Sequence, residues 1–413
     1  MSLAILSMHT SPFAQLGLGD GGGMNVYVKK LSSALARSGI ECDVFTRATS
    51  SDQPSEIAVE PNLRLHNIKA GPLEPVPKAN LDKFLDDFTS EVAKKLTSGR
   101  FPWNSPLDAI HANYWLSGVV GHRLKHELEV PLISTFHTLE KVKAELAQDQ
   151  DENTFQRARA EGEVIACSDV VLASCSSEAR QLISMYSAHP NRIQILPPGV
   201  QNKVFFPTDK IHARSSLGID PLAKVLLFVG RIQALKGPDV AIETLGLLEN
   251  KEAILIIVGG PSGPFGQRDF DYCKDLVRSL GLEKRVRFIP PQPHETLSSY
   301  YRAADICLVP SRSESFGLVA LEAAACGTPV VAASVGGLTN LVDPGHSGFL
   351  VNSRNPAEYA FVCDQILNDA RLSSRLSQNA VEQASHYTWS GAAFKFRKVL
   401  RLVQEEEILV ECC

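Results

Sequence analysis

The stretch Val225-Leu-Leu-Phe-Val-Gly230-Arg231-Ile-Gln-Ala-Leu-Lys236-Gly237 contains the pattern from which the fold can be predicted. It opens with a strand-sized apolar run that has no polar face, which is typical of a parallel β-strand covered by helices on both sides. Arg231 and Lys236 follow this run directly. Because ligands bind at the carboxyl ends of the strands in open parallel sheets, we expect both cations to lie at a ligand site. The planar guanidinium of Arg231 and the compact ammonium of Lys236 together suit a diphosphate. The alternative is that both are solvated loop cations.

Similar apolar runs alternate with helical stretches along the whole chain. Because strands that alternate with helices favour doubly wound sheets, we predict an α/β fold with two Rossmann-like domains. The predicted strands are Leu3–Met8, Cys42–Arg47, Leu63–Ile68, Ala109–Ala112, Leu132–Phe136, Val170–Ala173 and Ile193–Leu196 in the first half, and Val225–Gly230, Ala253–Gly259, Val286–Ile289, Ile306–Val309, Val330–Ala333 and Phe349–Val351 in the second.

A proline-rich segment near the middle of the chain interrupts this alternation. It contains Pro197-Pro198-Gly199 and Phe205-Phe206-Pro207, and we expect the interdomain hinge there. The predicted domains are residues 1–205 and 206–385, followed by a C-terminal helix and tail at 386–413. That helix either closes its own domain or crosses back onto the first.

Charge and composition exclude several classes of partner. The 413 residues include 41 Lys plus Arg and 46 Asp plus Glu, for a formal net charge of −5, so there is no basic footprint for nucleic acid and no polybasic membrane arm. No apolar run is long enough to span a bilayer, and the N-terminus has no basic leader. The nine cysteines include no C-x-x-C pair, which favours free thiols. We therefore expect a cytoplasmic protein that holds any anionic ligand with a local cluster of cations.

A glycine-rich loop precedes the first helix, in the stretch Gly17-Leu-Gly19-Asp20-Gly21-Gly22-Gly23. Its glycines fit G-x-G-x-x-G, but eight residues separate them from the first strand, and the second strand ends in Thr46-Arg47 and not in an acidic residue. This spacing argues against a dinucleotide redox cofactor. The loop still leads into a helix N-terminus, whose free N–H groups suit an anion. The alternative is a flexible loop.

Two glutamates follow the predicted strand Ile306–Val309, in the stretch Ser311-Arg-Ser-Glu314-Ser-Phe-Gly317-Leu-Val-Ala-Leu-Glu322. We expect Glu314 in the loop and Glu322 within the next helix. One of the two can then line a sugar pocket, while the other reaches deeper along the helix. An acidic side chain in so apolar a helix needs a hydrogen-bond partner, and ribose hydroxyls are suitable. The alternative is a pair of solvated glutamates at a helix start.

A second group of polar side chains is associated with strand ends in the first half of the chain. His9 and His137 each end a predicted strand, although a single histidine is more often structural. Hydrogen-bond donors near them suggest a second anion site. These donors are Lys78, Tyr114, Thr138 and Arg157.

The pair Glu314 and Glu322, together with Arg231 and Lys236, resembles the retaining glycosyltransferases of family 4, whose GT-B fold has two facing Rossmann-like domains. The resemblance extends from Ser7 to about Trp389. Further motifs resemble the branch of this family that transfers N-acetylglucosamine from UDP-GlcNAc to 1D-myo-inositol 3-phosphate, the first step of mycothiol biosynthesis. These motifs are Ser7-Met-His9-Thr-Ser-Pro12, Asp20-Gly21-Gly22-Gly23-Met24-Asn25-Val-Tyr27, Phe45-Thr-Arg47-Ala-Thr49, Tyr114-Trp-Leu-Ser-Gly118 and Gly259-Gly-Pro-Ser-Gly263.

The resemblance implies a role for individual residues, a bound metal and an oligomeric state. It implies an acceptor site of His9, Asp20, Gly21, Gly22, Gly23, Met24, Asn25, Lys78, Tyr114, Thr138 and Arg157. It implies a donor site of Gln15, Leu16, Gly23, Arg231, Lys236, Gln292, Glu314 and Glu322. The expected catalytic residues are Arg231, Lys236 and His137. A structural Mg²⁺ is expected at Tyr301, Arg302, Ala304 and Thr328, largely through main-chain oxygens, and a homodimer is a family-level expectation.

The sequence departs from the family at two of these positions: Gln292 stands where arginine is usual, and Gly21 stands where serine is common. If side chain 292 contacts the donor, one cationic contact is lost.

In a retaining transfer the departing diphosphate accepts the acceptor's proton, so Glu314 and Glu322 are expected to bind substrate and not to act as nucleophiles. The alternatives are a transferase of the sucrose-phosphate synthase or inositol-lipid mannosyltransferase type, a nucleotide-sugar epimerase that uses His9 and His137 for proton transfer, and a non-catalytic nucleotide-sugar sensor.

Overall fold

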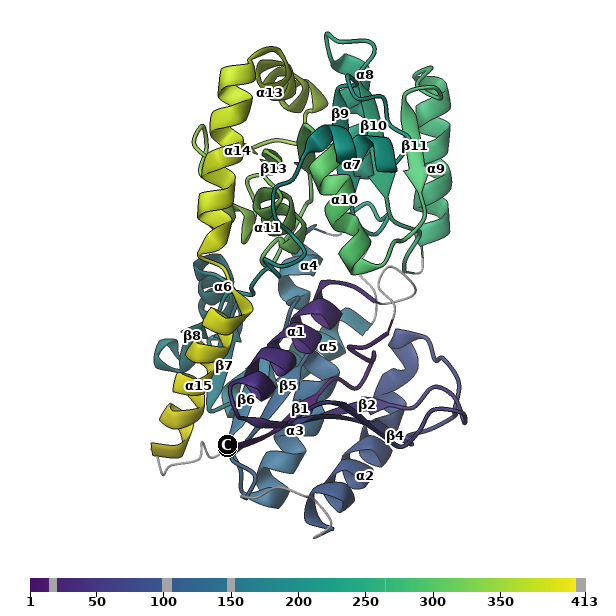
Figure 1. The fold of residues 1–413 in the computed structure, drawn as a ribbon. Helices are drawn as coiled ribbons and strands as arrows, with labels where there is room; N and C mark the ends of the chain where they lie inside the picture. The colour runs from purple at the N-terminus through teal and green to yellow at the C-terminus, as the bar shows by residue number, and fades with distance from the viewer. Residues whose placement is uncertain (15–20, 99–105, 147–152, 264, 406–413) are drawn as a thin grey trace. The chain divides into compact units, whose positions relative to one another are not determined.

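A computed structural model describes residues 1–14, 21–98, 106–146, 153–263 and 265–405. The chain forms two compact units (Figure 1). The first contains Met1–Ala14, Gly23–Pro197 and the C-terminal helix from Trp389, and the second is built mainly from Pro198–Thr388. The division falls inside the proline-rich segment, and residues 198–205, which we assigned to the first domain, group with the second unit.

The first unit is built around an eight-stranded sheet whose order is β3-β4-β2-β1-β5-β6-β7-β8. All its pairings are parallel except that of β3 with β4. Its strands are β1 (Ser2–Leu6), β2 (Glu41–Arg47), β3 (Glu56–Glu60), β4 (Leu63–Ile68), β5 (Ala109–Asn113), β6 (Leu132–Thr135), β7 (Val170–Ala173) and β8 (Ile193–Ile195). The predicted strands are present, and the exposed edge strand β3 is additional.

The connections of this sheet are mostly helical. The helices are α1 (Gly23–Arg37), η1 (Lys78–Phe84), α2 (Leu85–Thr97), α3 (Trp115–Leu128), α4 (Glu140–Leu146), α5 (Asn153–Cys167), α6 (Ser176–Tyr186) and η2 (Pro190–Arg192). In α1 the apolar stripe that contains Val28, Leu31 and Leu35 is buried, and Gly39 follows the helix at φ +87°. This is the left-handed conformation in which glycine commonly ends a helix.

The C-terminal helix α15 (Trp389–Glu405) packs on α1 of the first unit. The ring of Trp389 meets that of Tyr27 edge-on at a centroid distance of 6.0 Å, and Phe396 lies 4.9 Å from the ring of His111. The sequence left open whether this helix closes its own domain or crosses back onto the first. The structure shows that it crosses back onto the first unit.

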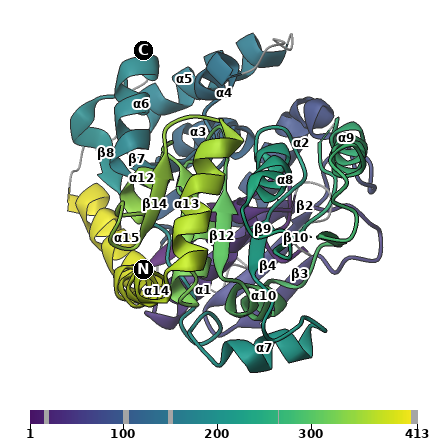
Figure 2. The same cartoon turned by 90° about the horizontal axis from the view of Figure 1, so that it is seen from above.

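The second unit contains a six-stranded, fully parallel sheet of order β11-β10-β9-β12-β13-β14. Figure 2 labels its strands β9, β10, β12 and β14. Its strands are β9 (Val225–Val229), β10 (Ile254–Val258), β11 (Val286–Ile289), β12 (Ile306–Val309), β13 (Val330–Ala333) and β14 (Gly348–Val351). Its helices are α7 (Lys210–Ser216), α8 (Pro238–Leu247), α9 (Gly266–Ser279), η3 (His294–Thr296), α10 (Leu297–Ala303), α11 (Leu318–Ala325), α12 (Leu338–Leu341), α13 (Pro356–Asn368) and α14 (Ala370–Ser385).

Helices cover both faces of this second sheet. In β9, Leu226 and Phe228 belong to a core shared with α8, α9 and α13, while Val225 and Leu227 belong to a core shared with α7, α10 and α11. An apolar run without a polar face thus forms a strand buried on both sides. The prediction of two doubly wound α/β domains is confirmed.

In each sheet the strand order reverses direction at one point, between β1 and β5 in the first and between β9 and β12 in the second. The loops that leave neighbouring strands at such a point diverge to opposite faces and leave a crevice at the carboxyl edge. The loops after β1, β5, β9 and β12 carry several of the predicted site residues, namely His9, Tyr114, Arg231, Lys236 and Glu314.

Two further sequence expectations meet the structure here. No helix in the described part of the chain is long and apolar enough to cross a membrane. Six cysteines are buried free thiols, namely Cys42, Cys175, Cys273, Cys307, Cys326 and Cys363. Cys167 is disulfide-bonded, so the expectation of a free thiol is wrong for that residue.

Candidate functional site

In the second unit, the loops after β9 and β12 meet at the predicted donor residues. Lys236 Nζ lies 2.5 Å from Glu314 Oε1, and the hydroxyl of Ser311 donates to the same oxygen at 2.9 Å. Gly237 has φ +72°, and a Cβ there would lie 2.3 Å from the carbonyl oxygen of Pro310. Only glycine permits this close approach, which positions Lys236 beside Glu314.

Arg231 follows Gly230, the first residue after β9, and is half-buried. Lys236 and Arg231 therefore leave the same strand end. At the neighbouring strand end, α11 begins after Gly317 with no side-chain cap, so its first N–H groups remain available to an anion. Two cations and a helix N-terminus form an arrangement suited to a diphosphate.

Glu322 is buried in α11 and has protein partners. Its Oε1 lies 2.6 Å from His294 Nε2, and its Oε2 accepts a hydrogen bond of 2.9 Å from the hydroxyl of Tyr301. Burial, and then the neighbouring Glu322, raise the pKa of Tyr301 well above its usual value. The hydrogen-bond partners that Glu322 was expected to need are thus His294 and Tyr301. The sequence did not predict either residue as a partner of Glu322.

The amide of Gln292 donates to the carbonyl of Pro290 at 2.9 Å. In this conformation the side chain is turned toward its own loop. Its contact with a donor stays a prediction.

The predicted magnesium ligands lie between α10 and the loop before β13. The hydroxyl of Thr328 donates to the carbonyl oxygen of Tyr301 at 2.6 Å, and the amide of Ala304 donates to the same oxygen at 3.1 Å. The side chain of Arg302 binds the carbonyls of Phe206 and Val204, which leaves its own main-chain oxygen as the predicted ligand. Oxygen donors suit Mg²⁺, although the ion would have to replace the hydrogen bond from Thr328.

In the first unit, the predicted acceptor residues gather around the ring of Tyr114. Lys78 Nζ lies 4.1 Å and the guanidinium carbon of Arg157 lies 4.8 Å from the ring centroid, while the ring of His9 lies 4.4 Å away. The guanidinium of Arg157 also donates to the hydroxyl of Thr138 at 3.1 Å. Five residues from distant parts of the sequence thus form one cluster, in which two cations contact one aromatic ring.

Several of the remaining predicted residues that the structure describes lie near the start of α1. The side-chain amide of Asn25 donates to Thr10 Oγ1 at 3.0 Å and to the carbonyl of Ser11 at 2.8 Å, so it fixes the loop after β1. Gly23 and Met24 begin α1, whereas Gly21 and Gly22 group with the second unit. The other three predicted residues, Gln15, Leu16 and Asp20, lie outside the described residues.

His137 follows β6, is half-buried and has φ +63°, and its Nε2 lies 2.9 Å from Asn113 Oδ1. Burial lowers the pKa of His137 to about 3. The pKa of His9 is also well below the usual value, because of burial and then the charge of Lys78. Both rings are therefore neutral near pH 7, which argues against the proton transfers that an epimerase needs. Sequence reasoning missed Asn113, since an asparagine that ends a strand carries no signal by itself.

The first unit is expected to lose stability as the pH falls below about 6.5. His9, His111 and His137 have lowered pKa values through burial, so the unfolded chain binds more protons than the folded one in this range. Stability then rises with pH, by up to about 1.4 kcal/mol per pH unit for each histidine. Urea unfolding followed by circular dichroism at several pH values measures this slope. His111→Gln should reduce it, and a flat profile would contradict the prediction.

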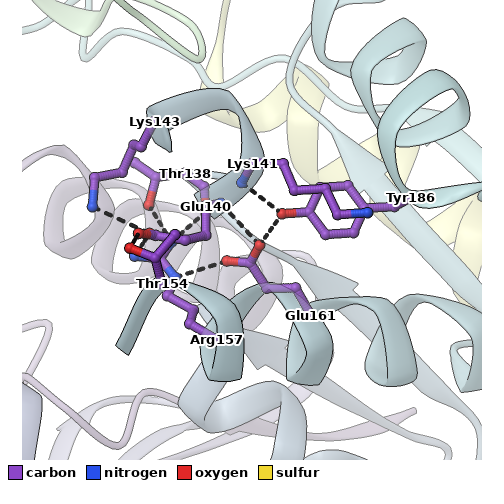
Figure 3. A network of polar contacts seen from close by, with 8 residues as sticks. All are labelled: Thr138, Glu140, Lys141, Lys143, Thr154, Arg157, Glu161 and Tyr186. Atoms are coloured by element: carbon purple, nitrogen blue, oxygen red, sulfur yellow. Dashed lines mark hydrogen bonds and ion pairs between the residues drawn. The ribbon is translucent and has the colours of Figure 1, made fainter. Parts of the chain in front are cut away.

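Arg157 is held by a polar network on α4, α5 and α6 (Figure 3). Its Nε donates to Glu161 Oε1 at 2.8 Å, and one Nη lies 2.7 Å from Glu140 Oε2. The fully buried Glu161 also accepts from the amide of Glu140 at 2.9 Å and from the hydroxyl of Tyr186. Burial alone would lower the pKa of Arg157, but the charges of Tyr114, Glu161 and Glu140 raise it. The sequence pattern singled out Arg157 and Thr138 in this network, but it did not predict Glu161, Glu140 and Tyr186 as members of it.

Comparison with known proteins gives two adjacent family matches and close relatives. The family described as "Glycosyl transferase 4-like domain" matches residues 22–199, and the family "Glycosyl transferases group 1" matches residues 209–383. D-inositol 3-phosphate glycosyltransferase of Acidothermus cellulolyticus is 44% identical over 394 residues, which cover 94% of this chain and 87% of that protein. D-inositol 3-phosphate glycosyltransferase 2 of Catenulispora acidiphila is 44% identical over 398 residues, with 95% and 92% covered.

Solved structures show the same fold. Sucrose-phosphate synthase from Thermosynechococcus elongatus superposes with a TM-score of 0.89 at 32% identity, covering 97% of this chain and 98% of that one. Anabaena HepE in complex with UDP and glucose gives a TM-score of 0.79 at 20% identity, covering 97% and 100%. The predicted GT-B fold class is confirmed.

Proposed function

This chain belongs to the D-inositol 3-phosphate glycosyltransferase family, and we propose that it transfers N-acetylglucosamine from UDP-GlcNAc to 1D-myo-inositol 3-phosphate with retention at the anomeric carbon. The observation that carries the proposal is the cluster of Lys78, Thr138 and Arg157 around Tyr114 in the first unit. Two cations beside one aromatic ring, with a hydroxyl bound to one of them, suit a phosphoryl group on the acceptor. A neutral polyol would not need them.

The donor is proposed to bind in the second unit, with its diphosphate at Arg231, Lys236 and the N-terminus of α11. As the bond from the sugar to the diphosphate breaks, negative charge grows on the leaving oxygen, and these cations stabilise it. Glu314 holds Lys236 in place, and Glu322 holds His294 and Tyr301.

Retention places the acceptor hydroxyl on the same face of the sugar as the leaving group. A diphosphate oxygen can then accept the proton of that hydroxyl. The neutral rings of His9 and His137 transfer no proton in this mechanism. No protein carboxylate has to act as a nucleophile, in contrast to glycoside hydrolysis.

Four further features belong to the proposal. A Mg²⁺ ion would bind at the main-chain oxygens of Tyr301, Arg302 and Ala304 and at the hydroxyl of Thr328, and would stabilise the turn before β12 without entering the reaction. A homodimer and a cytoplasmic location stay predictions. The pathway proposed for the product is mycothiol biosynthesis.

Acceptor-dependent release of UDP tests this function. The enzyme is incubated with UDP-GlcNAc and, in separate reactions, inositol 3-phosphate, free inositol or a hexose phosphate. Release with inositol 3-phosphate alone, and a product whose anomeric configuration by NMR matches the donor, is expected. Preference for the hexose phosphate would instead favour a sucrose-phosphate synthase type of activity, to which the 32% identical structure draws attention. UDP-GlcNAc that is epimerised without an acceptor would contradict both.

A further inference from the structure

The guanidinium of Arg157 already donates to groups of three residues (Figure 3). Its Nε binds Glu161 at 2.8 Å, one Nη binds Glu140 at 2.7 Å, and the other binds the carbonyl and hydroxyl of Thr138 at 2.9 and 3.1 Å. A guanidinium has five N–H donors and these contacts use four of them, so an anion that binds Arg157 through two N–H groups must take over at least one donor that these residues hold.

Glu161 and the carbonyl of Thr138 are parts of the framework. Glu161 is fully buried, and its carboxylate also binds the amide of Glu140 and the hydroxyl of Tyr186. The carbonyl of Thr138 is main chain and precedes α4. Displacing either from Arg157 would leave a buried acceptor unsatisfied or move the backbone, both of which are costly.

Glu140 is held differently. Apart from Arg157, its carboxylate is bound by Lys143 at 3.2 Å and by the hydroxyl of Thr154 at 3.2 Å. Lys143 is 42% exposed, so its flexible side chain can follow a moving partner. Glu140 is also the first residue of the short helix α4, and rotation of its side chain leaves the backbone contact with Glu161 in place.

Among the four residues that these ion pairs join, the charges balance without a ligand. Arg157 and Lys143 are matched by Glu140 and Glu161. A phosphoryl dianion beside Arg157 would lie next to the Glu140 carboxylate, and like charges at such a distance repel strongly in a buried site. Of the residues that hold Arg157, Glu140 is therefore the one that a phosphoryl group can replace, because its carboxylate carries a negative charge and can rotate away without moving the backbone.

We propose that the Glu140 carboxylate is a built-in competitor that holds the anion site of Arg157 and is displaced by the phosphoryl group of the acceptor. This inference rests on the proposed function for the identity of the acceptor. Glu140 then makes the site selective, because only a strongly charged group can replace it, whereas a neutral polyol cannot. It acts on acceptor binding and touches no reacting atom.

Glu140→Gln tests the proposal, because it keeps the shape and the oxygen acceptor and removes the charge. The expected result is a KM for inositol 3-phosphate that falls about tenfold, with kcat and the KM for UDP-GlcNAc unchanged. The KM for free inositol should not fall. The matched control is Glu163→Gln on the same helix as Arg157, since Glu163 forms an exposed pair with Arg159 at 2.9 Å and should have no effect on any of these constants.

Binding of inorganic phosphate, measured by calorimetry without any donor, separates this inference from the proposed function. Tighter phosphate binding by Glu140→Gln than by the wild type supports the competitor even if the wild type fails to transfer sugar to inositol 3-phosphate, a failure that would contradict the proposed function alone. Phosphate affinity that is unchanged or weaker in Glu140→Gln, with circular dichroism equal to that of the wild type, would overturn the inference. Glu140→Ala provides a second variant, for which the same gain in affinity is expected.

Discussion

Replacement of Lys236 by alanine is expected to lower kcat by a factor of about 10² to 10³, the usual effect of removing one group that stabilises charge in a transition state. Lys236 leaves the same strand end as Arg231 and lies beside the uncapped start of α11, where the leaving diphosphate is proposed to bind. Arg231→Ala should have an effect of the same order. The measurement is UDP release at saturating UDP-GlcNAc and inositol 3-phosphate.

The fold should survive this change. Lys236 is partly exposed, and such ion pairs contribute at most about 1 kcal/mol. Glu314 keeps the hydrogen bond from Ser311 in the variant. Lys274→Ala is the matched control, since Lys274 lies on the exposed side of α9 with Asp271 as its partner at 3.6 Å. Near-normal turnover in both Lys236→Ala and Arg231→Ala would defeat the assignment of the donor site.

The positions of these cations could be predicted because they depend on a local pattern. An apolar run without a polar face predicts a buried parallel strand, and the carboxyl end of such a strand is where ligands bind. The structure adds that Glu314 reaches Lys236 because β9 and β12 are neighbours in the sheet. Strand order depends on contacts between distant segments, and the sequence pattern does not contain it.

Residues that act through a partner were harder to find. Glu140 lies beside Arg157, Tyr186 beside Glu161 and Asn113 beside His137 only because segments that are distant in the sequence pack together. A single glutamate or tyrosine in a helix has no spacing that marks it. The exposed strand β3 was missed for a similar reason, since its pairing with β4 and not its own composition defines it.

The C-terminal helix illustrates the same limit. The sequence predicts a C-terminal helix, but the pattern of an amphipathic helix does not specify the surface on which it packs. Its contacts with Tyr27 and His111 are what place it on the first unit.

Replacement of Arg157 by lysine is expected to raise the KM for inositol 3-phosphate by roughly 10- to 100-fold, which corresponds to the loss of one or two charge-assisted hydrogen bonds. Lysine keeps the charge that Glu140 and Glu161 need but loses the planar fork, so it cannot bind Glu161, Thr138 and a phosphoryl group together. Because the donor binds elsewhere in the proposed mechanism, the KM for UDP-GlcNAc should stay within about twofold of the wild-type value.

The comparison that decides the role of Arg157 is between two arginines of one helix. Arg159 is 73% exposed and pairs with Glu163 at the surface, so Arg159→Lys should leave every kinetic constant unchanged. If Arg157→Lys instead lowers kcat and leaves the acceptor KM at its wild-type value, Arg157 does not bind the phosphoryl group. A loss of unfolding free energy without a change in acceptor KM would make the network of Figure 3 a structural element of the first unit, because a purely structural arginine has no reason to discriminate between inositol 3-phosphate and free inositol.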